Sequence, residues 1–351
     1  MAPDRYRAGH QDSDGDRDRN PDIRSAVDGT TPPGPDAGPD GPIKLSGRSW
    51  RRAIRGALRD FRADHLSDVA AALTYYAVLS IFPALLVLVA LVGLLGDSTS
   101  HEIIDNLTQL TPSTVRDILT AAFEDLRAHR GSAGIIALAG LLTALWAASA
   151  YVSAFMRAAN LIYDVPEGRP IWKTLPLRIG VTVLAGLLLV VSLLMVVLTG
   201  RVAEQVGAAL GVESTTVAVW DVAKWPVLVL LVSLVFGLLY WASPNARLGG
   251  IRWISPGSIL AVVLWLIASG LFAIYAANFG SYSRTYGALA SVIAFLVWLW
   301  LSNLALLLGA ELDAELERQR VVAAGFPEDV EPYLQLRDSR KVPKAKSETS
   351  R

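Results

Sequence analysis

The stretch VAAALTYYAVLSIFPALLVLVALVGLLG, which runs from residue 69 to residue 96, contains no Asp, Glu, Lys or Arg. A helix needs roughly 20 mostly apolar residues to cross about 30 Å of hydrocarbon. Buried helices of soluble proteins are rarely as long as this stretch. It therefore predicts a transmembrane helix, and with it an integral membrane protein.

Further stretches without charged residues follow at 131–156, 179–200, 225–246, 253–283 and 285–310. They lack the strict alternation of apolar and polar residues that is typical of outer-membrane barrel strands. A helix satisfies its own backbone polar groups in lipid, so helices are favoured. We predict an all-α membrane protein with six transmembrane helices and amphipathic interfacial helices. The expected spans lie at about 69–96, 135–158, 179–200, 225–243, 255–279 and 287–310.

The composition agrees with a lipid environment and excludes several kinds of site. Of the 351 residues, 52% are hydrophobic and only 18% are charged, whereas globular domains carry about 25% charged residues. The net charge of zero gives no overall attraction to nucleic acid. The chain has no cysteine, no phosphate-binding Walker loop and no Gly-x-Ser-x-Gly motif, and its four histidines lack metal-ligand spacing. We therefore expect no metal, no cofactor, and neither ATP-driven pumping by this chain alone nor zinc-dependent hydrolysis.

The two ends of the chain differ from the middle. Residues 1–46 are rich in Asp, Arg, Gly and Pro, a composition that cannot bury a core. They predict a disordered N-terminal tail, and the lack of an apolar run near the start predicts no cleavable signal peptide. The transmembrane domain is expected at 47–320 and a cytoplasmic C-terminal tail at 321–351.

The distribution of Lys and Arg predicts the orientation. With the N-terminus in the cytoplasm, fifteen Lys and Arg residues flank the spans on the cytoplasmic side and six on the other side. Positive residues are in excess on the cytoplasmic side of membrane proteins. Both termini are therefore expected in the cytoplasm.

Two segments outside the spans have the spacing of amphipathic helices. One begins at Thr111-Pro112 on the outer side, and the other covers 48–62 on the inner side. The inner one carries an apolar row among arginines, which indicates an interfacial helix attracted to anionic lipid headgroups. That row consists of Trp50, Ile54, Leu58 and Phe61. Ser255-Pro256 is interpreted as the cap and first turn of the fifth span.

The first span carries polar residues near its start. Thr74, Tyr75 and Tyr76 precede Pro83, and a proline within a helix frees a carbonyl group. A functional interpretation is a kinked helix that lines a polar cavity. The alternative is a packing kink, with both tyrosines anchored at the membrane interface.

The second span ends with Tyr151, Ser153, Arg157, Asn160 and Tyr163. Arg157 and Asn160 are three residues apart, so they share a helix face. A charge at membrane depth is a functional candidate. Arg157 lies near the cytoplasmic end, however, where a long side chain can reach the headgroups.

The turn between the fifth and sixth spans is the third candidate region. Asn278, Tyr282, Arg284 and Tyr286 lie in it together with two glycines. They predict a polar constriction in which the arginine meets an anionic group. An ordinary polar turn with interfacial aromatic residues is the alternative.

The sixth span contains Asn303 and ends with Glu311, Asp313 and Glu315. Carboxylates at a helix C-terminus oppose the helix dipole, so these groups are expected to have partners. We predict that Glu311 or Asp313 pairs with Arg157 or a nearby arginine. The functional interpretation is proton or ion coupling, and the alternative is a structural ion pair.

Three motifs resemble those of a known family, and the stretch from Arg157 to Tyr163 fits it as well. The motifs are AALTYYAVLSIFPA at 71–84, YGALASVI at 286–293 and LLGAELD at 307–313. They resemble the YihY/BrkB family of bacterial inner-membrane proteins, and the resemblance covers roughly residues 50–320. It implies a multi-pass protein of the bacterial cytoplasmic (inner) membrane with six helices.

The resemblance gives no catalytic residue. Members of the family have carried a ribonuclease BN label, which looks misapplied because no nuclease chemistry is visible in these residues. Others are tied to serum resistance or envelope lipid handling, which implies a transporter of lipid or another amphiphile. We expect such a transporter or flippase-like factor and no enzyme. A membrane-embedded enzyme and a non-transporting envelope scaffold are the alternatives.

The expected partners are membrane lipids and no nucleic acid, and a homo-oligomer is left open. The candidate polar pathway combines the regions above. It consists of Thr74, Tyr75, Tyr76, Arg157, Asn160, Tyr163, Asn278, Tyr282, Arg284, Tyr286, Asn303, Glu311 and Asp313.

Overall fold

The computed structural model describes residues 32–93, 133–197, 214–249, 251–279, 287–328 and 330–342. Within these ranges the chain forms a short 3-10 helix, η1 (Pro42–Lys44), and seven α-helices. The same ranges hold no strand beyond an isolated bridge between Ala246 and Leu336. This confirms an all-α protein over the described part. The helices are α3 (Gly47–Ala63), α4 (Leu66–Gly93), α7 (Ala133–Ile162), α8 (Ile171–Val197), α10 (Ser214–Ala242), α11 (Ile251–Phe279) and α12 (Gly287–Ala323).

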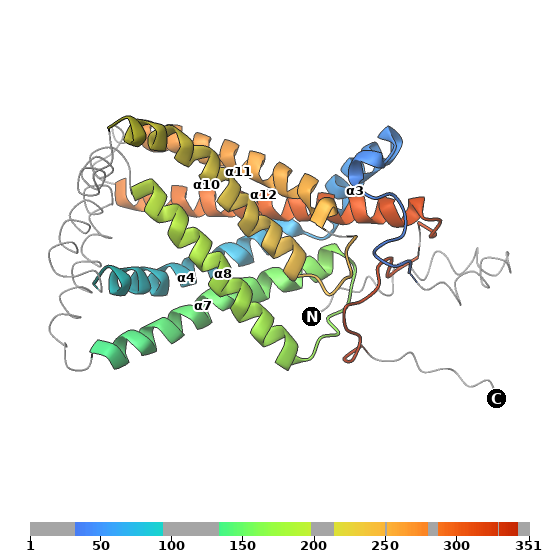
Figure 1. Ribbon diagram of the computed structural model, residues 1–351, viewed down its shortest axis with the longest axis horizontal. Helices are drawn as coiled ribbons and strands as arrows, with labels where there is room; N and C mark the ends of the chain where they lie inside the picture. The colour runs from blue at the N-terminus through green and yellow to red at the C-terminus, as the bar shows by residue number, and fades with distance from the viewer. Residues whose placement is uncertain are drawn as a thin grey trace.

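Six long helices form an elongated bundle, and α3 lies outside it beside the C-terminal part of α12 (Figure 1). α4 packs on α7, α11 packs on α12, and α10 lies against both α8 and α11. α12 also contacts α3 and α4. The end of the bundle that carries α3, the C-terminal part of α12 and residues 330–342 is called the α3 end below.

Five of the described helices are long and apolar enough to cross a membrane, at Leu141–Ile162, Ile171–Val196, Val219–Ala242, Pro256–Tyr275 and Val292–Ala323. Large apolar side chains such as Leu187, Trp146 and Ile274 point outward from them, as expected where lipid replaces water. α4 is 28 residues long. Its part with described side chains, Leu66–Ile81, is a shorter apolar helix of the same kind.

α11 and α12 approach each other closely at a pair of glycines. A side-chain carbon on Gly257 would collide with the carbonyl oxygen of Gly309, and one on Gly309 would collide with that of Gly257. Small residues at helix contacts let backbones meet in membrane proteins. Nearby, the rings of Phe155 on α7 and Tyr240 on α10 stack with centroids 6.2 Å apart. These contacts form the core toward the α3 end.

The predicted helix cap of the fifth span is wrong. α11 begins at Ile251, so Pro256 lies inside the helix and does not follow a cap at Ser255. Proline cannot donate to the helical ladder. The next N–H group, that of Gly257, donates to the Asp313 carboxylate at 2.7 Å. A side chain of α12 thus supports the interrupted region, which a local sequence pattern does not reveal.

Both expected tails contain ordered segments. In the expected N-terminal tail, the Pro32 carbonyl accepts a hydrogen bond from Gln335 at 2.9 Å, and the Ala37 carbonyl accepts one from Arg320 at 2.6 Å. Between 321 and 342, α12 continues to Ala323, and the side chain of Tyr333 is buried against the core. Residues 32–46 thus differ from the disordered tail that we expected, because contacts to their backbone carbonyls hold them. The outer amphipathic segment after Thr111 lies outside the described residues.

Candidate functional site

A chain of hydrogen bonds crosses the interior of the bundle and joins three helices. Tyr151 on α7 donates through its hydroxyl to Asn303 Oδ1 on α12 at 2.8 Å. Asn303 Nδ2 donates to Thr74 Oγ1 on α4 at 3.1 Å, and the Thr74 hydroxyl donates to the Ala70 carbonyl at 2.8 Å. Sequence analysis placed Thr74 and Asn303 in the candidate pathway and left Tyr151 outside it. The structure brings all three together.

The two tyrosines after Thr74 diverge. The Tyr75 side chain is 62% exposed on the surface of the bundle, so it does not line an interior path. Tyr76 is half-buried and packs against the core. The exposure of Tyr75 agrees with the alternative that places both tyrosines at the membrane interface, whereas the packing of Tyr76 against the core does not.

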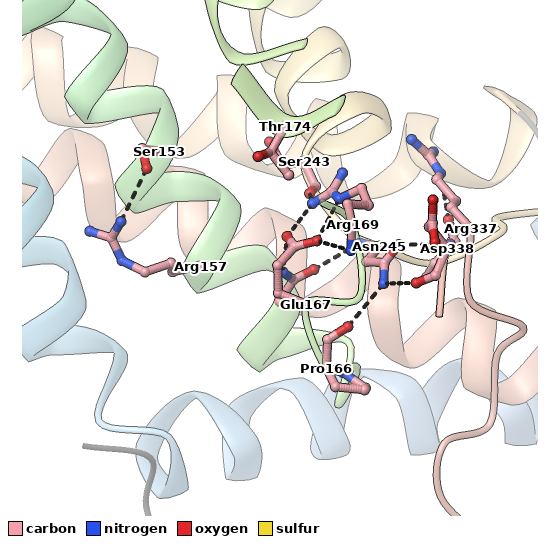
Figure 2. A network of polar contacts seen from close by, with 12 residues as sticks. Ser153, Arg157, Pro166, Glu167, Arg169, Thr174, Ser243, Asn245, Arg337 and Asp338 are labelled. Carbon is pink, nitrogen blue, oxygen red and sulfur yellow. Dashed lines mark hydrogen bonds and ion pairs between the residues drawn. The ribbon is translucent and has the colours of Figure 1, made fainter. Parts of the chain in front are cut away.

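Asn160 belongs to a second polar cluster at the α3 end, together with Glu167, Arg169 and Asn245, which Figure 2 shows. Its Oδ1 accepts from the backbone N–H of Asn245 at 2.7 Å, and its Nδ2 donates to Glu167 at 2.9 Å. Glu167 forms an ion pair with Arg169 at 2.7 Å. Arg169 also donates to the carbonyl of Ser243 at 2.8 Å. These hydrogen bonds hold the connection between α7 and α8 against the turn after α10.

Asn245 joins this cluster to the C-terminal segment. Its side chain donates to the carbonyls of Pro166 (3.0 Å) and Asp338 (2.8 Å), and it accepts from the Asp338 N–H at 3.1 Å. Lys173 of α8 pairs with the Asp338 carboxylate at 2.7 Å. Arg337 donates to the Ala246 carbonyl at 2.8 Å. We call Asn160, Glu167, Arg169, Lys173, Asn245, Arg337 and Asp338 the clasp.

The acidic groups of the clasp are charged at neutral pH. Burial raises the pKa of Glu167, but hydrogen bonds from Arg169 and Asn160 outweigh it and hold that pKa below its ordinary value. The hydrogen bond from Lys173 lowers the pKa of Asp338. Tyr163, at the end of α7, is buried in the core, and burial raises its pKa well above the ordinary value. The tyrosine is therefore neutral there.

The predicted pairing of Arg157 is wrong. Its guanidinium is exposed and donates to Ser153 Oγ at 3.2 Å, away from the clasp (Figure 2). Among the described residues it forms no ion pair with Glu311 or Asp313. Asn160, three residues further on, turns into the interior while Arg157 faces outward, so shared spacing on a helix did not give a shared environment.

The carboxylates at the end of α12 do have partners, but from other sources. Asp313 accepts from the Gly257 N–H. Glu317 accepts from the Gly249 N–H at 2.7 Å and pairs with Arg320 at 2.6 Å. Glu315 lies 3.6 Å from Arg318. Two buried oxygens of this group, Glu311 Oε2 and Asp313 Oδ2, accept no hydrogen bond from the described residues.

The rest of the candidate pathway lies outside what the structure describes. Tyr282, Arg284 and Tyr286 are outside the described residues, and Asn278 is placed only as part of the α11 backbone. Within the described ranges, no group of three or more His, Cys, Asp or Glu side chains could hold a metal ion.

An apolar cavity that opens to the surface of the bundle lies between α11 and α12, toward the end opposite the α3 end. Its volume is about 310 Å³, at the lower end of the range for ligand pockets, roughly 300–1,000 Å³. Beside it, Trp298 donates to Ser269 Oγ at 3.1 Å, and the rings of Trp298 and Phe272 are 5.7 Å apart. The lining residues are Ala268, Leu271, Phe272, Tyr275, Ile293, Ala294, Val297, Trp298 and Leu301.

Sequence analysis missed most of the clasp. Asn245 and Asp338 are 93 residues apart, and no spacing rule joins them. The only local signal was the Pro244-Asn245 pair, a common turn element, at the end of the fourth charge-free stretch. The cavity-lining residues are ordinary apolar residues of a span and carry no signal of their own.

Known proteins resemble the chain over most of its length. Residues 57–331 match the sequence model of a family described as Virulence factor BrkB. The ribonuclease-like protein YfkH of Bacillus subtilis is 30% identical over 250 residues, which are 71% of this chain and 90% of that protein. UPF0761 membrane proteins of Chromohalobacter salexigens and Aromatoleum aromaticum are each 31% identical, over 79% and 80% of this chain and 67% and 68% of theirs. No solved structure matches.

Proposed function

We propose that this chain, which belongs to the Virulence factor BrkB family, moves a lipid or another amphiphile across the bacterial inner membrane. The family match confirms the resemblance seen in its motifs. The chain is a multi-pass membrane protein of bacteria, as its membrane-protein relatives and its five apolar helices show. The finer assignment below is our proposal.

The proposed topology has six spans, α4, α7, α8, α10, α11 and α12, with both termini in the cytoplasm. The length of α4 supports the sixth span, and the excess of Lys and Arg at the α3 end supports the orientation. A reporter that is active only outside the cytoplasm, fused after Arg351, should be inactive. Activity of that fusion would contradict the orientation.

The cavity between α11 and α12 is the observation that carries the transport proposal. It lies between the apolar segments Pro256–Tyr275 of α11 and Val292–Ala323 of α12, and its lining is almost entirely apolar. An apolar space in a lipid-embedded bundle suits a hydrocarbon chain better than an ion or a sugar. The hydrogen-bonded chain of Tyr151, Asn303 and Thr74 lies on another side of the same helix, α12. It gives the bundle a polar interior that an amphiphile's headgroup could use.

Lipid movement in vesicles tests the proposal. Purified protein is reconstituted in phosphatidylcholine vesicles that contain a fluorescent phospholipid, and a membrane-impermeant quencher reports the fraction that reaches the outer leaflet. Ala294→Trp fills the cavity and should slow the transfer at least tenfold. Leu266→Trp, at an exposed position on α11, is the matched control and should leave the rate unchanged. Transfer no faster than in protein-free vesicles would overturn the proposal.

The alternative of a membrane-embedded enzyme has one observation in its favour, the ribonuclease-like name of the Bacillus subtilis relative. No cluster suited to a metal ion occurs in the described residues, and metal-dependent cleavage needs such a cluster. We therefore expect purified protein, free of soluble nucleases, to leave RNA intact in Mg²⁺ or Mn²⁺. Cleavage that one substitution abolishes, with folding retained, would favour the enzyme.

A further inference from the structure

In the topology proposed above, α3 lies at the boundary between the membrane and the cytoplasm, because it connects directly to the first span, α4. It ends at Ala63, and α4 begins at Leu66 only two residues later. His65 has a φ of 51°, in the left-handed region, so the chain turns sharply there. The three Cα–Cα steps from Ala63 to Leu66 reach at most about 11 Å. The level at which α4 enters the membrane therefore fixes the level of α3.

The face of α3 that packs on the bundle is built from small residues. Ala53, Gly56 and Ala57 are buried against Leu312 and Leu316 of α12. A side-chain carbon on Gly56 would collide with the Glu315 carboxylate. Because α3 packs so closely on α12 through these small residues, its larger side chains lie on its other faces.

The apolar row predicted on this helix is divided. Trp50 and Phe61 are half-buried, and the Trp50 ring nitrogen donates to the Pro42 carbonyl at 3.0 Å. Ile54 and Leu58 are 48% and 53% exposed. They are four residues apart, so they form one apolar edge. Nothing within the described chain covers this edge.

Next to the apolar edge runs a stripe of arginines. Arg51, Arg55 and Arg62 are exposed and have no acidic partner among the described residues. At intervals of four and seven they occupy one side of the helix, and Arg48 lies on the same side. The other two arginines of the helix have acidic neighbours, since Arg59 pairs with Asp60 at 2.8 Å and Arg52 lies 4.0 Å from Glu328.

We propose that α3 is a binding surface for anionic phospholipids of the membrane in which the protein sits. The stripe of Arg51, Arg55 and Arg62 contacts the phosphate groups, and Ile54 and Leu58 enter the adjoining acyl region. The charges of the stripe attract anionic groups, and hydrocarbon favourably covers the apolar edge beside them. A lipid headgroup layer supplies both at the depth where α3 is fixed. RNA would match the arginines but would leave the apolar edge in water.

The test measures the thermal unfolding of the full-length protein in neutral detergent micelles that contain increasing dioleoylphosphatidylglycerol or dioleoylphosphatidylcholine. A ligand that binds the folded state raises the unfolding temperature with concentration. Phosphatidylglycerol should raise it and phosphatidylcholine should not. In Arg51→Gln/Arg55→Gln/Arg62→Gln, the phosphatidylglycerol concentration for half of the effect should increase roughly 100-fold, or about five-fold per arginine.

Three controls make the result specific. Lysines at the same three positions keep the charge and should keep most of the response. Arg247→Gln removes another exposed arginine of the α3 end and should change little. Ile54→Ser/Leu58→Ser should weaken the response to phosphatidylglycerol. Equal unfolding temperatures in phosphatidylcholine verify that all variants fold.

Two results would overturn the proposal. One is a phosphatidylglycerol response that is the same in the glutamine variant as in the parent protein. The other is an equal response to inorganic phosphate or to a short single-stranded RNA, unaffected by Ile54→Ser/Leu58→Ser. That second result would assign the stripe to free phosphate or nucleic acid. None of these measurements depends on lipid transfer, so they stand or fall independently of the transport proposal.

Discussion

Among single residues, Asn245 has the most connections at the α3 end. It links the segment after α7, the turn after α10 and residues 330–342 through four hydrogen bonds. Asn245→Ala would leave the Asp338 N–H and two carbonyl groups without partners, and each buried unsatisfied group costs about 1–3 kcal/mol. We expect a loss of about 3 kcal/mol in the free energy of unfolding, seen as a lower unfolding temperature. Arg247→Gln, two residues away and exposed, should have almost no effect.

Tyr151 and Asn303 should behave as a coupled pair. Tyr151→Phe removes the hydroxyl and leaves Asn303 Oδ1 without its donor, a loss of about 1–2 kcal/mol. Asn303→Leu should be destabilising by itself, because it leaves the Tyr151 hydroxyl without its acceptor. The double variant should be less destabilised than the sum of the two, by at least about 0.5 kcal/mol. Strictly additive losses would show that the hydrogen bond contributes nothing.

The ion pair between Lys173 and Asp338 makes part of the stability depend on pH. The ordinary pKa of the carboxyl is 3.8, and the hydrogen bond from Lys173 lowers it in the folded protein. The pair is therefore complete above about pH 5, and its contribution is lost as the pH falls through the lowered pKa. Asp338→Asn should unfold at a lower temperature than the parent at pH 7, and the gap should narrow progressively as the pH falls below about 4. Glu328→Gln, at an exposed carboxylate, should show no such gap.

On the scale of helices, the contact between α11 and α12 depends on glycine. Gly257→Ala would push a side-chain carbon into the carbonyl oxygen of Gly309 and the carboxylate of Asp313. Backbone cannot move aside easily, so we expect a loss of about 1–3 kcal/mol or more. Gly270→Ala, on the same helix with open space around it, should be neutral or stabilise by up to about 1 kcal/mol. Equal effects of the two substitutions would contradict the close contact.

The helices were easier to predict than the side chains that meet between them. The lack of charges over 22 or more residues was enough to place the apolar helices, because hydrocarbon imposes one length on all of them. The start of α11 could not be predicted, because Gly257, next to the proline, donates to Asp313, 56 residues along the chain. The apolar spacing of α3 suggested one continuous face. Ala53, Gly56 and Ala57 instead determine its seat, because small residues allow the closest approach.

At the scale of the whole molecule, the C-terminal segment holds the α3 end together. Truncation after Glu328 would remove Asp338 and Arg337, and with them the contacts to Asn245, Ala246 and Lys173. We expect a protein that unfolds at a lower temperature and that proteases cleave faster in the segment 163–170. Truncation after Val342 keeps every contact described here and is the matched control. Similar proteolysis of both forms would contradict this role.

The candidate site was predicted only in part, for a physical reason that applies to the whole bundle. Thr74 and Asn303 were recognised because polar groups in a span need partners. Arg157 and Tyr75 were assigned to the same path, yet they face outward, since the rotation of a helix about its axis is set by packing. The clasp depends on backbone carbonyls and on residues far apart in sequence. Such contacts leave no mark on local composition.

A single helix, α12, runs from the cavity to the contact with α3. It spans 37 residues without a proline, so it is about 55 Å long, and kinks concentrate at prolines. Its N-terminal half lines the cavity and its C-terminal half packs against α3. A tilt of the whole helix therefore moves both regions together. A tilt of about 10° around its midpoint moves each end by about 5 Å. A lipid tail that wedges α11 from α12 would therefore displace α3 at the far end. Spin labels at positions 51 and 247 should report this displacement in lipid, and Ala294→Trp should abolish it.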